Sequence, residues 1–315
     1  MFPIPDNRDH LVSTETSQIQ PNDVPDRSKR PPSVIRSGLY VVSTPIGNMG
    51  DLTKRAEEIL ASATLIACED TRVTGKLLAK KGITSRMLAY HDHSPPSVRH
   101  DLIRRLKDGE IVALVSDAGT PLVSDPGYKL VAAAVEAGLY VTAAPGPASP
   151  MAALVLSGLP SDRFLFVGYL PTKENARRAT IREFATIRAT LIFLESARRL
   201  GASLSTLADV LGERPVAVAR ELTKRYEEVT RGSLCELAVK YRNENPPKGE
   251  IVVVVGPAPD MSLDLTDLDS LLAEALVHMS VRDAAATVAS ASGAPRRTVY
   301  RRALEIAREL DSKDR

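Results

Sequence analysis

Short apolar runs alternate with amphipathic segments along the middle of the chain. Five runs rich in β-branched residues predict strands at 39–43, 64–67, 87–90, 111–115 and 139–143. Amphipathic segments between them predict helices at 52–61, 72–81, 98–107 and 128–137. This rhythm is typical of a mainly parallel sheet covered by helices. The runs show little apolar–polar alternation, as expected for strands buried on both faces.

A second series follows a Ser-Gly-Leu-Pro-Ser segment at 157–161, which predicts a hinge. Strands are expected at 164–167, 190–194, 216–219 and 251–255, and helices at 175–188 and 198–210. From 262 onward the pattern predicts helices only. Ser280 is expected to cap one of them, Gly293 and Pro295 to form a turn, and 296–310 to form the last helix.

The pattern therefore divides the chain into four parts. Residues 1–36 are polar and rich in proline, which predicts a disordered leader. Residues 37–156 and 157–259 predict two α/β domains, and 260–315 a small helical appendage. The appendage has the order helix, Gly-containing turn, Arg-rich helix, which resembles a helix-turn-helix. A packing role and a nucleic-acid-binding role are equally compatible with it.

Composition narrows the possible functions. The 315 residues contain 41 Lys plus Arg and 39 Asp plus Glu, so the net charge of +2 argues against a protein that coats polyanions by bulk charge. No Trp and 4% aromatic residues argue against a base-stacking sheet. Cys68 and Cys235 are far apart, which excludes a disulfide scaffold and a zinc ribbon. No apolar run approaches the ~18 residues of a membrane span, and no secretory signal is evident, so a cytoplasmic protein is expected.

Polar loops rich in Gly and Pro follow four of the predicted strands. The sequence lacks G-x-G-x-x-G, a P-loop and a G-x-S-x-G elbow, which disfavours dinucleotide, P-loop and hydrolase sites. The loops lie at 44–48, 69–72, 116–127 and 145–149. Ligands of open α/β sheets bind at the carboxyl ends of strands. Four such loops at one edge therefore predict a preformed small-molecule pocket.

Longer motifs make a family resemblance visible. They are TPIGNMGDLTKRA (44–56), CEDTRVTGKLL (68–78), SDAGTPLVSDPG (116–127), PGPASP (145–150), SGLPSDRFLFVGYLP (157–171), ESARRL (195–200), ARELTKRYEEVTRGS (219–233) and KGEIVVVVG (248–256). In this order they resemble the tetrapyrrole-methylase superfamily of S-adenosylmethionine-dependent methyltransferases, in its branch that acts on 16S rRNA. The resemblance spans about 38–257.

The resemblance implies a fold and an activity. It implies two α/β domains of the class III methyltransferase type, with S-adenosylmethionine bound in a cleft between them. The implied acceptor is the ribose 2′-hydroxyl of a cytidine in the decoding centre of 16S rRNA. A homodimer is implied as well. The basic clusters are spread over several segments, so we expect the assembled small ribosomal subunit to be preferred as substrate.

Cofactor-binding residues are carried over from the matched motifs. They are Pro45, Asp117, Gly119, Thr120, Val123, Ser124, Asp125, Pro145, Gly146, Ala148 and Leu194. The family often has Ser before Ala where this chain reads Ala148-Ser149, and Pro where this chain has Ala197. Both changes conserve size, so they affect detailed contacts rather than the chemistry.

Methyl transfer from a sulfonium is an in-line displacement in which positioning supplies much of the acceleration. No metal is required. A carboxylate or Lys near the ribose hydroxyl can accept or orient its proton, worth roughly 10²–10⁴-fold in rate. The candidates are Asp70, Glu195, Glu221 and Lys224, with Glu69 and Asp117 as further possibilities. The sequence does not choose among them.

Basic clusters are candidates for contacts with RNA phosphates. They comprise Arg72, Lys173, Arg177, Arg178, Arg182, Lys224, Arg225, Arg231, Arg296, Arg297, Arg301 and Arg302. A solvated charged face is the ordinary reading of each cluster. The segment His91-Asp92-His93 has the spacing of two metal ligands on a strand, but no third ligand cluster accompanies it, so a polar loop at the cleft is favoured.

Two alternatives remain. The same fold methylates tetrapyrrole carbons in cobalamin or sirohaem synthesis, but those relatives carry a glycine-rich first loop in place of TPIGN. The EDTR and RELTK strings argue against that reading as well. A non-enzymatic ribosome-binding protein with a retained cofactor fold is the other alternative, and the intact loop 116–127 argues against it.

Overall fold

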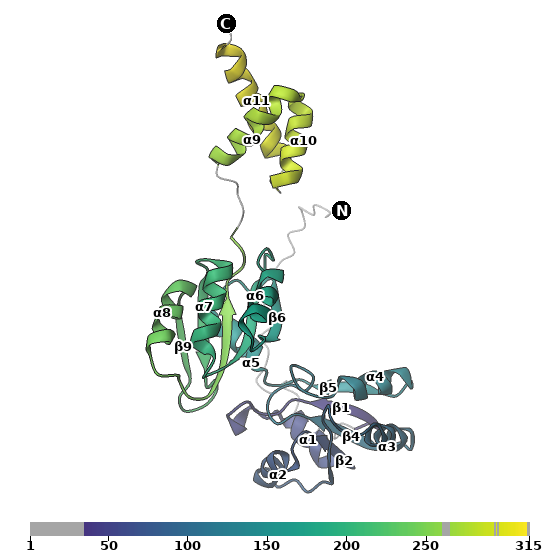
Figure 1. Cartoon of the computed structure of the whole chain (residues 1–315). Helices are drawn as coiled ribbons and strands as arrows, with labels where there is room; N and C mark the ends of the chain where they lie inside the picture. The colour runs from purple at the N-terminus through teal and green to yellow at the C-terminus, as the bar shows by residue number, and fades with distance from the viewer. Residues whose placement is uncertain (1–34, 260–264, 293, 295, 314–315) are drawn as a thin grey trace, which may run out of the picture. The chain divides into compact units, whose positions relative to one another are not determined.

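The computed structural model describes residues 35–259, 265–292, 294 and 296–313. The expected leader at 1–36 therefore lies almost wholly outside the described residues, as do the expected turn residues Gly293 and Pro295. The described elements lie within one unit, Ser37–Arg315 (Figure 1). None of the described helices is long and apolar enough to cross a membrane.

The first sheet is entirely parallel and confirms the five strands expected from the sequence. Its strands are β1 (Gly38–Val42), β2 (Leu65–Cys68), β3 (Met87–Ala89), β4 (Ile111–Val115) and β5 (Val141–Ala144). The accompanying helices are η2 (Met49–Asp51), α1 (Lys54–Ser62), α2 (Thr71–Lys80), α3 (Pro96–Lys107) and α4 (Tyr128–Glu136). Among these, η2 is a single 3₁₀ turn that lies just before the helix expected at 52–61 and was not predicted.

The strand order places two loops side by side. The order is β3-β2-β4-β1-β5, so β1 and β4 are neighbours. The chain leaves β1 toward β2 and leaves β4 toward β5, in opposite directions along the sheet. Such a reversal opens a crevice at the carboxyl ends of the two strands. The loops after β1 and β4 flank this crevice.

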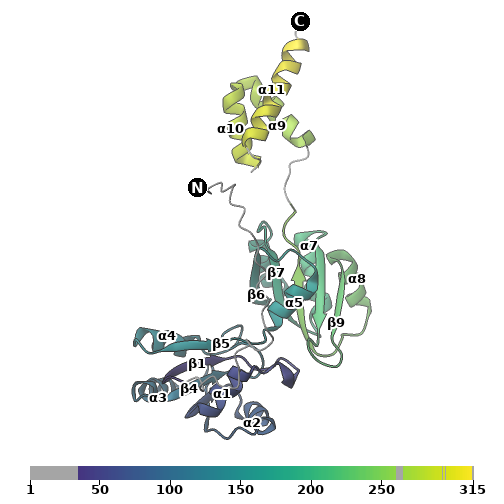
Figure 2. The same ribbon diagram turned by 180° about the vertical axis from the view of Figure 1, so that it is seen from behind.

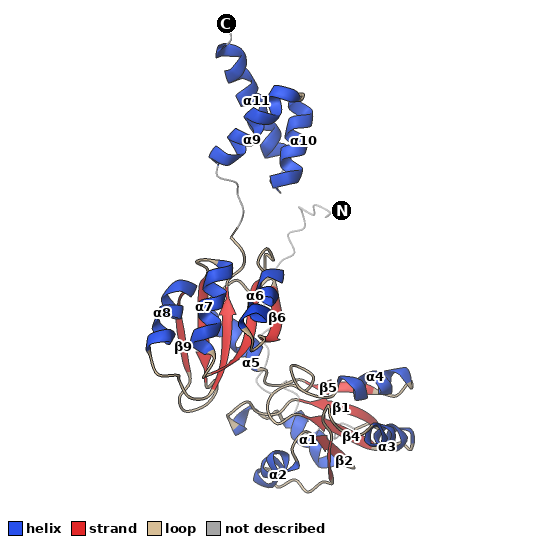
Figure 3. Cartoon of the chain, viewed as in Figure 1, coloured by secondary structure: helices blue, strands red, loops and turns tan. Residues whose placement is uncertain are grey.

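The second sheet is mixed and carries the remaining helices. Its strands are β6 (Phe164–Tyr169), β7 (Thr190–Ser196), β8 (Pro215–Arg220), β9 (Glu228–Ser233) and β10 (Glu250–Val255), in the order β6-β7-β10-β8-β9. Its helices are α5 (Ser149–Ser157), α6 (Glu174–Glu183), α7 (Leu200–Leu211) and α8 (Leu234–Asn243) (Figure 3). Neighbouring strands β6 and β7 pair in parallel, and the other neighbouring strands of this sheet pair antiparallel.

Three of these elements, α5, α8 and β9, were not expected from the sequence. The edge strand β9 has a single apolar residue, Val229, and therefore gives almost no hydrophobic signal. The start of α8 carried a readable signal, because Ser233 and Glu236 form a capping box. The expected helix 175–188 was too long, since α6 ends at Glu183 and the chain turns there toward β7.

Alternation along the strands assigns side chains to the two faces of the second sheet. Leu191 and Phe193 of β7 belong to the core under α7 and α8. Ile192 and Leu194 face the opposite side, where α5 packs. Figure 1 shows α7 and α8 on one face of the sheet, and the reverse view in Figure 2 shows α5 on the other. Successive residues of one strand therefore have different environments.

Helix α5 packs on the second sheet, although the expected domain limit falls after it. Its Ala153 and Leu154 are buried against strands of that sheet. Helix α5 ends at Ser157, where Gly158 adopts a left-handed conformation with φ 76°. The packing thus places the change of sheet near residue 148, whereas the ranges 37–156 and 157–259 remain predictions.

The described part of the C-terminal region contains three helices, in agreement with the expectation of helices only. They are α9 (Leu265–His278), α10 (Val281–Ser292) and α11 (Arg296–Lys313). Leu272, Val288 and Val299 join them in a core of their own. Ser280 accepts a hydrogen bond from the backbone N–H of Asp283 at 3.2 Å, which confirms the expected cap of α10.

Candidate active site

Three loops of the first sheet are fastened to one another by hydrogen bonds. The backbones of Thr44 and Gly119 exchange two hydrogen bonds, of 2.8 and 3.0 Å. The Thr120 hydroxyl donates to the carbonyl oxygen of Pro147 at 3.0 Å and lies 2.9 Å from the Ser43 hydroxyl. The loops after β1, β4 and β5 are therefore one preformed unit.

Glycine is required where two of these loops meet. A Cβ on Gly146 would lie 2.8 Å from the Cβ of Ser43, closer than two carbons approach without displacement. Gly119 has φ +85°, a conformation that side-chain-bearing residues rarely adopt. These two glycines shape the loops rather than presenting groups to a ligand.

Among the described residues, four other than glycine have a positive φ, and all lie in two loops. Leu122 and Ser124 have φ 73° and 64°, in the loop after β4. Glu221 and Thr223 have φ 49° and 63°, in the loop after β8. Strained backbone of this kind persists where the surrounding structure holds it, and it clusters at ligand sites. Both loops contribute to the cavity described next.

A cavity of about 300 Å³ lies among these loops and the second sheet. We call it the loop cavity. Its lining consists of Ile46, Glu69, Asp117, Ala118, Val123, Ser124, Asp125, Ser149, Tyr169, Leu194, Ala219, Leu222, Glu250, Ile251 and Val252. Four of the lining residues are acidic, Glu69, Asp117 and Asp125 from the first sheet's loops and Glu250 from β10, and most of the others are apolar. That combination suits a ligand with a positive charge and an apolar body.

Three carboxylates of the loop cavity are partly desolvated. Burial is the main cause that raises the pKa of Glu69, Asp117 and Asp125 above the ordinary values. The negative charge of Asp117 raises the pKa of Glu69 and Asp125 further. No ion pair involves any of the three within the part of the chain that the structure describes. Their charge is available to a cationic ligand.

The structure separates the expected cofactor residues into two groups. Those that line the loop cavity are Asp117, Val123, Ser124, Asp125 and Leu194. Those that do not line it are Pro45, Gly119, Thr120, Pro145, Gly146 and Ala148. Pro45 lines an adjoining pocket, and the others hold the loops together or border them.

Several lining residues were missed. Ser149 directly follows the expected Ala148, and Glu69 was weighed only as a proton acceptor. Three further lining residues lie at or near strand ends of the second sheet. They are Tyr169 of the YLP motif and Ala219 and Leu222 of the ARELTK motif. Alternation along β7 and β8 divides their side chains between two faces of the sheet. Which of the two faces lines the cavity is decided only by the tertiary structure.

Asp70 is occupied by a structural role. Its carboxylate caps α2 by accepting the backbone N–H of Arg72 at 2.8 Å, and it binds the Arg72 guanidinium at 2.6 Å. The Arg72 hydrogen bonds lower the pKa of Asp70 to about 2. A carboxylate held this acidic is a weak proton acceptor. The same ion pair holds the Arg72 guanidinium at Asp70, although the Arg72 side chain remains exposed.

Glu195 lies on the opposite face of β7 from the loop cavity, contrary to the expected position in the cleft. It is 3% exposed. Its carboxylate accepts the Ser196 N–H at 2.7 Å and the Ser203 hydroxyl, and pairs with Arg199 at 3.4 Å. Leu194 and Glu195 were expected together, but adjacent strand residues point to opposite faces. Glu195 therefore anchors α7.

Glu221 and Lys224 form an ion-paired unit. The Lys224 ammonium lies 2.9 Å from Glu221 and 2.9 Å from Glu250. Burial opposes the charge of Lys224, but its hydrogen bonds to the two carboxylates raise its pKa. The Lys224 hydrogen bond lowers the pKa of Glu221. Lys224 is thus protonated near neutrality and is not a proton acceptor there.

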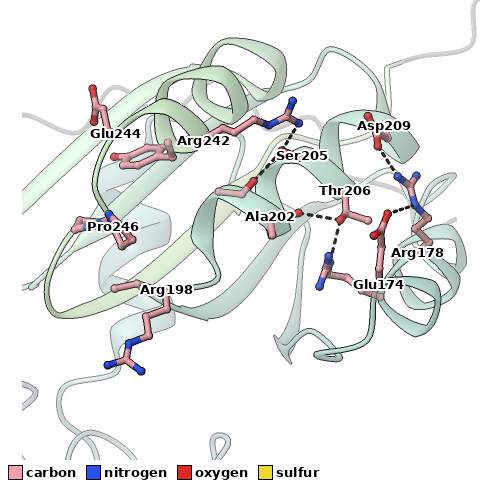
Figure 4. A pocket seen from close by; sticks show the side chains of 15 residues that line it. Glu174, Arg178, Arg198, Ala202, Ser205, Thr206, Asp209, Arg242, Glu244 and Pro246 are labelled. Atoms are coloured by element: carbon pink, nitrogen blue, oxygen red, sulfur yellow. Dashed lines mark hydrogen bonds and ion pairs between the residues drawn. The ribbon is translucent and has the colours of Figure 1, made fainter.

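Of the expected basic cluster at α6, Arg177 is buried, Arg178 is partly exposed, and Lys173 and Arg182 are exposed. Arg177 is 6% exposed, and its guanidinium donates to the Thr206 hydroxyl at 2.9 Å and to the Thr172 carbonyl at 3.2 Å. This corrects the expectation that Arg177 faces RNA. Arg178 pairs with Glu174 at 3.1 Å and Asp209 at 2.6 Å (Figure 4). Both arginines line a groove of about 610 Å³, here called the α6–α7 groove.

The other expected RNA residues are exposed. Lys173 precedes α6 in an exposed position, and Arg225 stacks on Tyr226 with 5.6 Å to the ring centre. Arg296, Arg297 and Arg301 lie exposed on α11. Arg302 differs, because its guanidinium binds Asp269 at 2.6 Å and Glu305 at 2.6 Å. It holds α11 to α9.

The His91-Asp92-His93 segment forms a turn after β3. The rings of His91 and His93 are 6.2 Å apart. The described ranges contain no group of three His, Cys, Asp or Glu side chains arranged to hold a metal ion. His91 is close enough to Glu69 to lower the pKa of that carboxyl slightly against the larger effect of burial.

Comparison with known proteins is consistent with this geometry. A model of the Tetrapyrrole (Corrin/Porphyrin) Methylases matches residues 38–238. The chain belongs to the tetrapyrrole methylase family. A second model, the RsmI C-terminal HTH domain, matches residues 263–307. The family resemblance and the fold class predicted from the sequence are confirmed, and the protein is a methyltransferase.

Curated relatives are similar over nearly their whole length. A protein of Erythrobacter litoralis is 50% identical over 281 residues, covering 89% of this chain and 98% of the relative. A protein of Mesorhizobium japonicum is 48% identical, covering 88% and 94%. One of Escherichia coli O157:H7 is 44% identical, covering 85% and 94%. Each is named Ribosomal RNA small subunit methyltransferase I.

Solved structures support the fold of this family member. The methyltransferase CobJ aligns with a TM-score of 0.53 at 20% identity, covering 70% of this chain and 95% of that one. Uroporphyrin-III-C-methyltransferase of Thermus thermophilus aligns with a TM-score of 0.51 at 23% identity, covering 70% and 94%. At this identity they bear on the fold alone.

Proposed function

We propose that this protein transfers a methyl group from S-adenosylmethionine to the ribose 2′-hydroxyl of a cytidine in the decoding centre of 16S rRNA. The observation that carries the proposal is 44–50% identity over most of the chain to proteins named as small-subunit rRNA methyltransferases. The acidic and apolar loop cavity adds a physical reason for the choice of donor.

The residues of the loop cavity fit S-adenosylmethionine. That molecule carries positive charges on its sulfonium and its amine, and Glu69, Asp117 and Asp125 offer carboxylates without ion-pair partners in the described residues. Leu194 and Val252 offer apolar walls for its uncharged parts. When bound, the donor supplies a methyl group already activated by positive charge.

The chain itself supplies position and a route for the proton. In the reaction the ribose oxygen forms a bond to the methyl carbon, the sulfur–methyl bond breaks, and the hydroxyl proton leaves. Asp70 and Lys224 are unsuited to accept that proton because one is strongly acidic and the other is protonated. Glu69 and Asp117 line the cavity with raised pKa values, so we assign proton acceptance to one of these two.

The proposal includes the partners. RNA contacts are assigned to the exposed cations Arg72, Lys173, Arg225, Arg296, Arg297 and Arg301, with the assembled small subunit in the bacterial cytoplasm as substrate. We assign the contact between the two subunits of a homodimer to α5, where Met151, Val155 and Leu156 are exposed and apolar. The three helices of the C-terminal region are assigned to RNA through the exposed arginines of α11.

Mass-spectrometric nucleoside mapping of 16S rRNA tests the proposal. Cells lacking the gene should lose one 2′-O-methylcytidine, and the wild-type gene should restore it whereas Asp117→Ala should not. An unchanged map would refute the proposed acceptor, and an assay with precorrins would then test the tetrapyrrole alternative. A purified protein that binds no S-adenosylmethionine would refute the proposed donor.

A further inference from the structure

A second cavity adjoins the loop cavity. It measures about 360 Å³ and shares Ile46, Asp117, Ala118 and Glu250 with the loop cavity. Its other lining residues are Thr44, Pro45, Gly47, Met49, Val73, Lys76, Leu77, Lys80 and Lys224. We call it the lysine pocket. A group held in it lies across a common wall from a group held in the loop cavity.

One face of α2 forms a side of the lysine pocket. Val73, Lys76, Leu77 and Lys80 follow one another at helical spacing, so their side chains share a face. Asp70 fixes the start of this helix through its cap. The sequence reading singled out Arg72 on this helix but neither of the two lysines.

Lys76 and Lys80 differ from the neighbouring cations in having no counter-ion. Both are exposed, and no ion pair involves either of them in the described ranges. Lys81, which directly follows the helix, pairs with Glu57, and Lys224 across the pocket pairs with Glu221 and Glu250. Two uncompensated ammonium groups therefore border a cavity with apolar walls.

We propose that the lysine pocket receives the acceptor nucleotide, with Lys76 and Lys80 bound to phosphates of the RNA strand next to it. This rests on the proposed function. An acceptor ribose must reach the wall shared with the loop cavity, and Pro45, Ile46 and Val73 provide apolar surface for a base or sugar. Phosphate contacts from lysine fix the register of a strand without reading its sequence.

The proposal assigns binding, not chemistry, to the two lysines. Their ammonium groups add to the affinity for RNA by neutralising phosphates and releasing counter-ions. Neither lysine lines the loop cavity, so the affinity for S-adenosylmethionine does not depend on them. Loss of both should raise the KM for the RNA substrate and leave donor binding unchanged.

The test compares the full-length wild type with the double variant Lys76→Gln/Lys80→Gln on purified small subunits from cells lacking the gene. We expect the KM for subunits to rise about tenfold or more, with kcat little changed. The slope of log affinity against log salt should fall by about 1.4–1.8, because each lost phosphate contact removes about 0.7–0.9. Donor affinity by calorimetry should equal that of the wild type, which also shows that the variant folds.

Two control variants make the result specific. Lys76→Arg/Lys80→Arg keeps the charge and should retain most of the affinity for subunits. Lys129→Gln removes an exposed lysine of α4 that does not line the lysine pocket and should behave as the wild type. If the double Gln variant matched Lys129→Gln in KM and salt slope, the inference would be overturned.

Failure of the proposed function gives a different result. A wild-type protein that binds S-adenosylmethionine but methylates no small subunit would overturn the proposed function, and this inference with it. A wild type that methylates subunits, combined with an unaffected double variant, would overturn only the assignment of Lys76 and Lys80.

Discussion

The loop cavity and the α6–α7 groove are both lined by charged side chains, but their charges are used differently. In the groove, Arg178 binds Glu174 and Asp209. The Arg177 guanidinium donates hydrogen bonds to the Thr206 hydroxyl and the Thr172 carbonyl oxygen. In the loop cavity, Glu69, Asp117 and Asp125 are partly buried and form no ion pair among the described residues, whereas Glu250 pairs with Lys224.

Under the proposed function, this difference makes unpaired charge a better guide to the ligand site than cavity size. The groove is larger, at about 610 Å³ against about 300 Å³ for the loop cavity. A desolvated charge without a partner costs stability, so it persists where a ligand or a reaction needs it. Paired charges, by contrast, are explained by the fold they hold together.

The largest expected effect is on methyl transfer when a carboxylate of the loop cavity is removed. Asp117→Ala should lower kcat/KM on small subunits by more than about 100-fold, since it removes a charge that faces the cationic donor. The matched control Asp209→Ala removes a carboxylate of the α6–α7 groove and should leave transfer near wild type. Equal losses in the two variants would remove the distinction between the sites.

The next effect is a loss of stability, and we expect it for a substitution in the α6–α7 groove. Arg177→Met should lower the free energy of unfolding by about 2–3 kcal/mol, because hydrogen bonds of a buried charged group are lost and the Thr172 carbonyl loses its donor. Urea unfolding measures the change, and affinity for S-adenosylmethionine should stay the same. A stable Arg177→Met protein with weak binding to small subunits would instead restore the RNA role first expected for this residue.

A smaller loss is expected where the loop after β1 meets the loop after β8. A Cβ on Gly47 would lie 2.4 Å from Cγ of Lys224 and 3.0 Å from the Thr223 hydroxyl, so Gly47→Ala must displace these side chains or the loop that carries them. The Asn48 N–H also donates to the Thr223 hydroxyl at 3.1 Å, and the shift would disturb this bond. Transfer should fall about tenfold, since small misplacements cost rate. Gly75→Ala on α2, where a Cβ has ordinary room, is the control, and a similar loss there would point to a general effect of substitution.

The smallest expected effect is a pH dependence of donor affinity. The pKa values of Glu69, Asp117 and Asp125 are raised, so these carboxylates take up protons at higher pH than ordinary ones. A cationic ligand favours the ionised form, so S-adenosylmethionine should bind several-fold more weakly at about pH 5 than at about pH 7.5. S-adenosylhomocysteine, which lacks the sulfonium charge, should show a smaller change by calorimetry. Parallel pH profiles for the two ligands would contradict the assignment of these carboxylates to the sulfonium.

Much of the fold followed from the sequence because apolar periodicity reports buried strands directly. The strand β4 was predicted at its observed limits, and the four helices of the first sheet within a few residues. The half-exposed edge strand β9 was not predicted because its sequence contains a single apolar residue. Helix α5 was overlooked because it is apolar nearly all round and has no helical stripe to detect.

The candidate site followed only in part. Loop composition predicted a pocket at the edge where the polar Gly-rich loops meet. The family resemblance then assigned Asp117 and Asp125 to it, and both line the loop cavity. It did not show that Glu195 is buried behind β7 or that Arg177 is internal, since both depend on which face of an element packs inward. The lysines of α2 gave no signal apart from an ordinary solvated face.

The sequence by itself determined the order of elements, the loops that carry polar chemistry and the family. These properties are local or are carried by long motifs, and they need no knowledge of which surfaces meet. The tertiary structure alone decided which charges are neutralised. Ion pairs such as Arg178–Asp209 and Lys224–Glu250 join residues distant in the chain, so pairing becomes visible only when the elements are packed. The carboxylates and lysines left unpaired in the described residues then mark the surfaces where we place donor and acceptor.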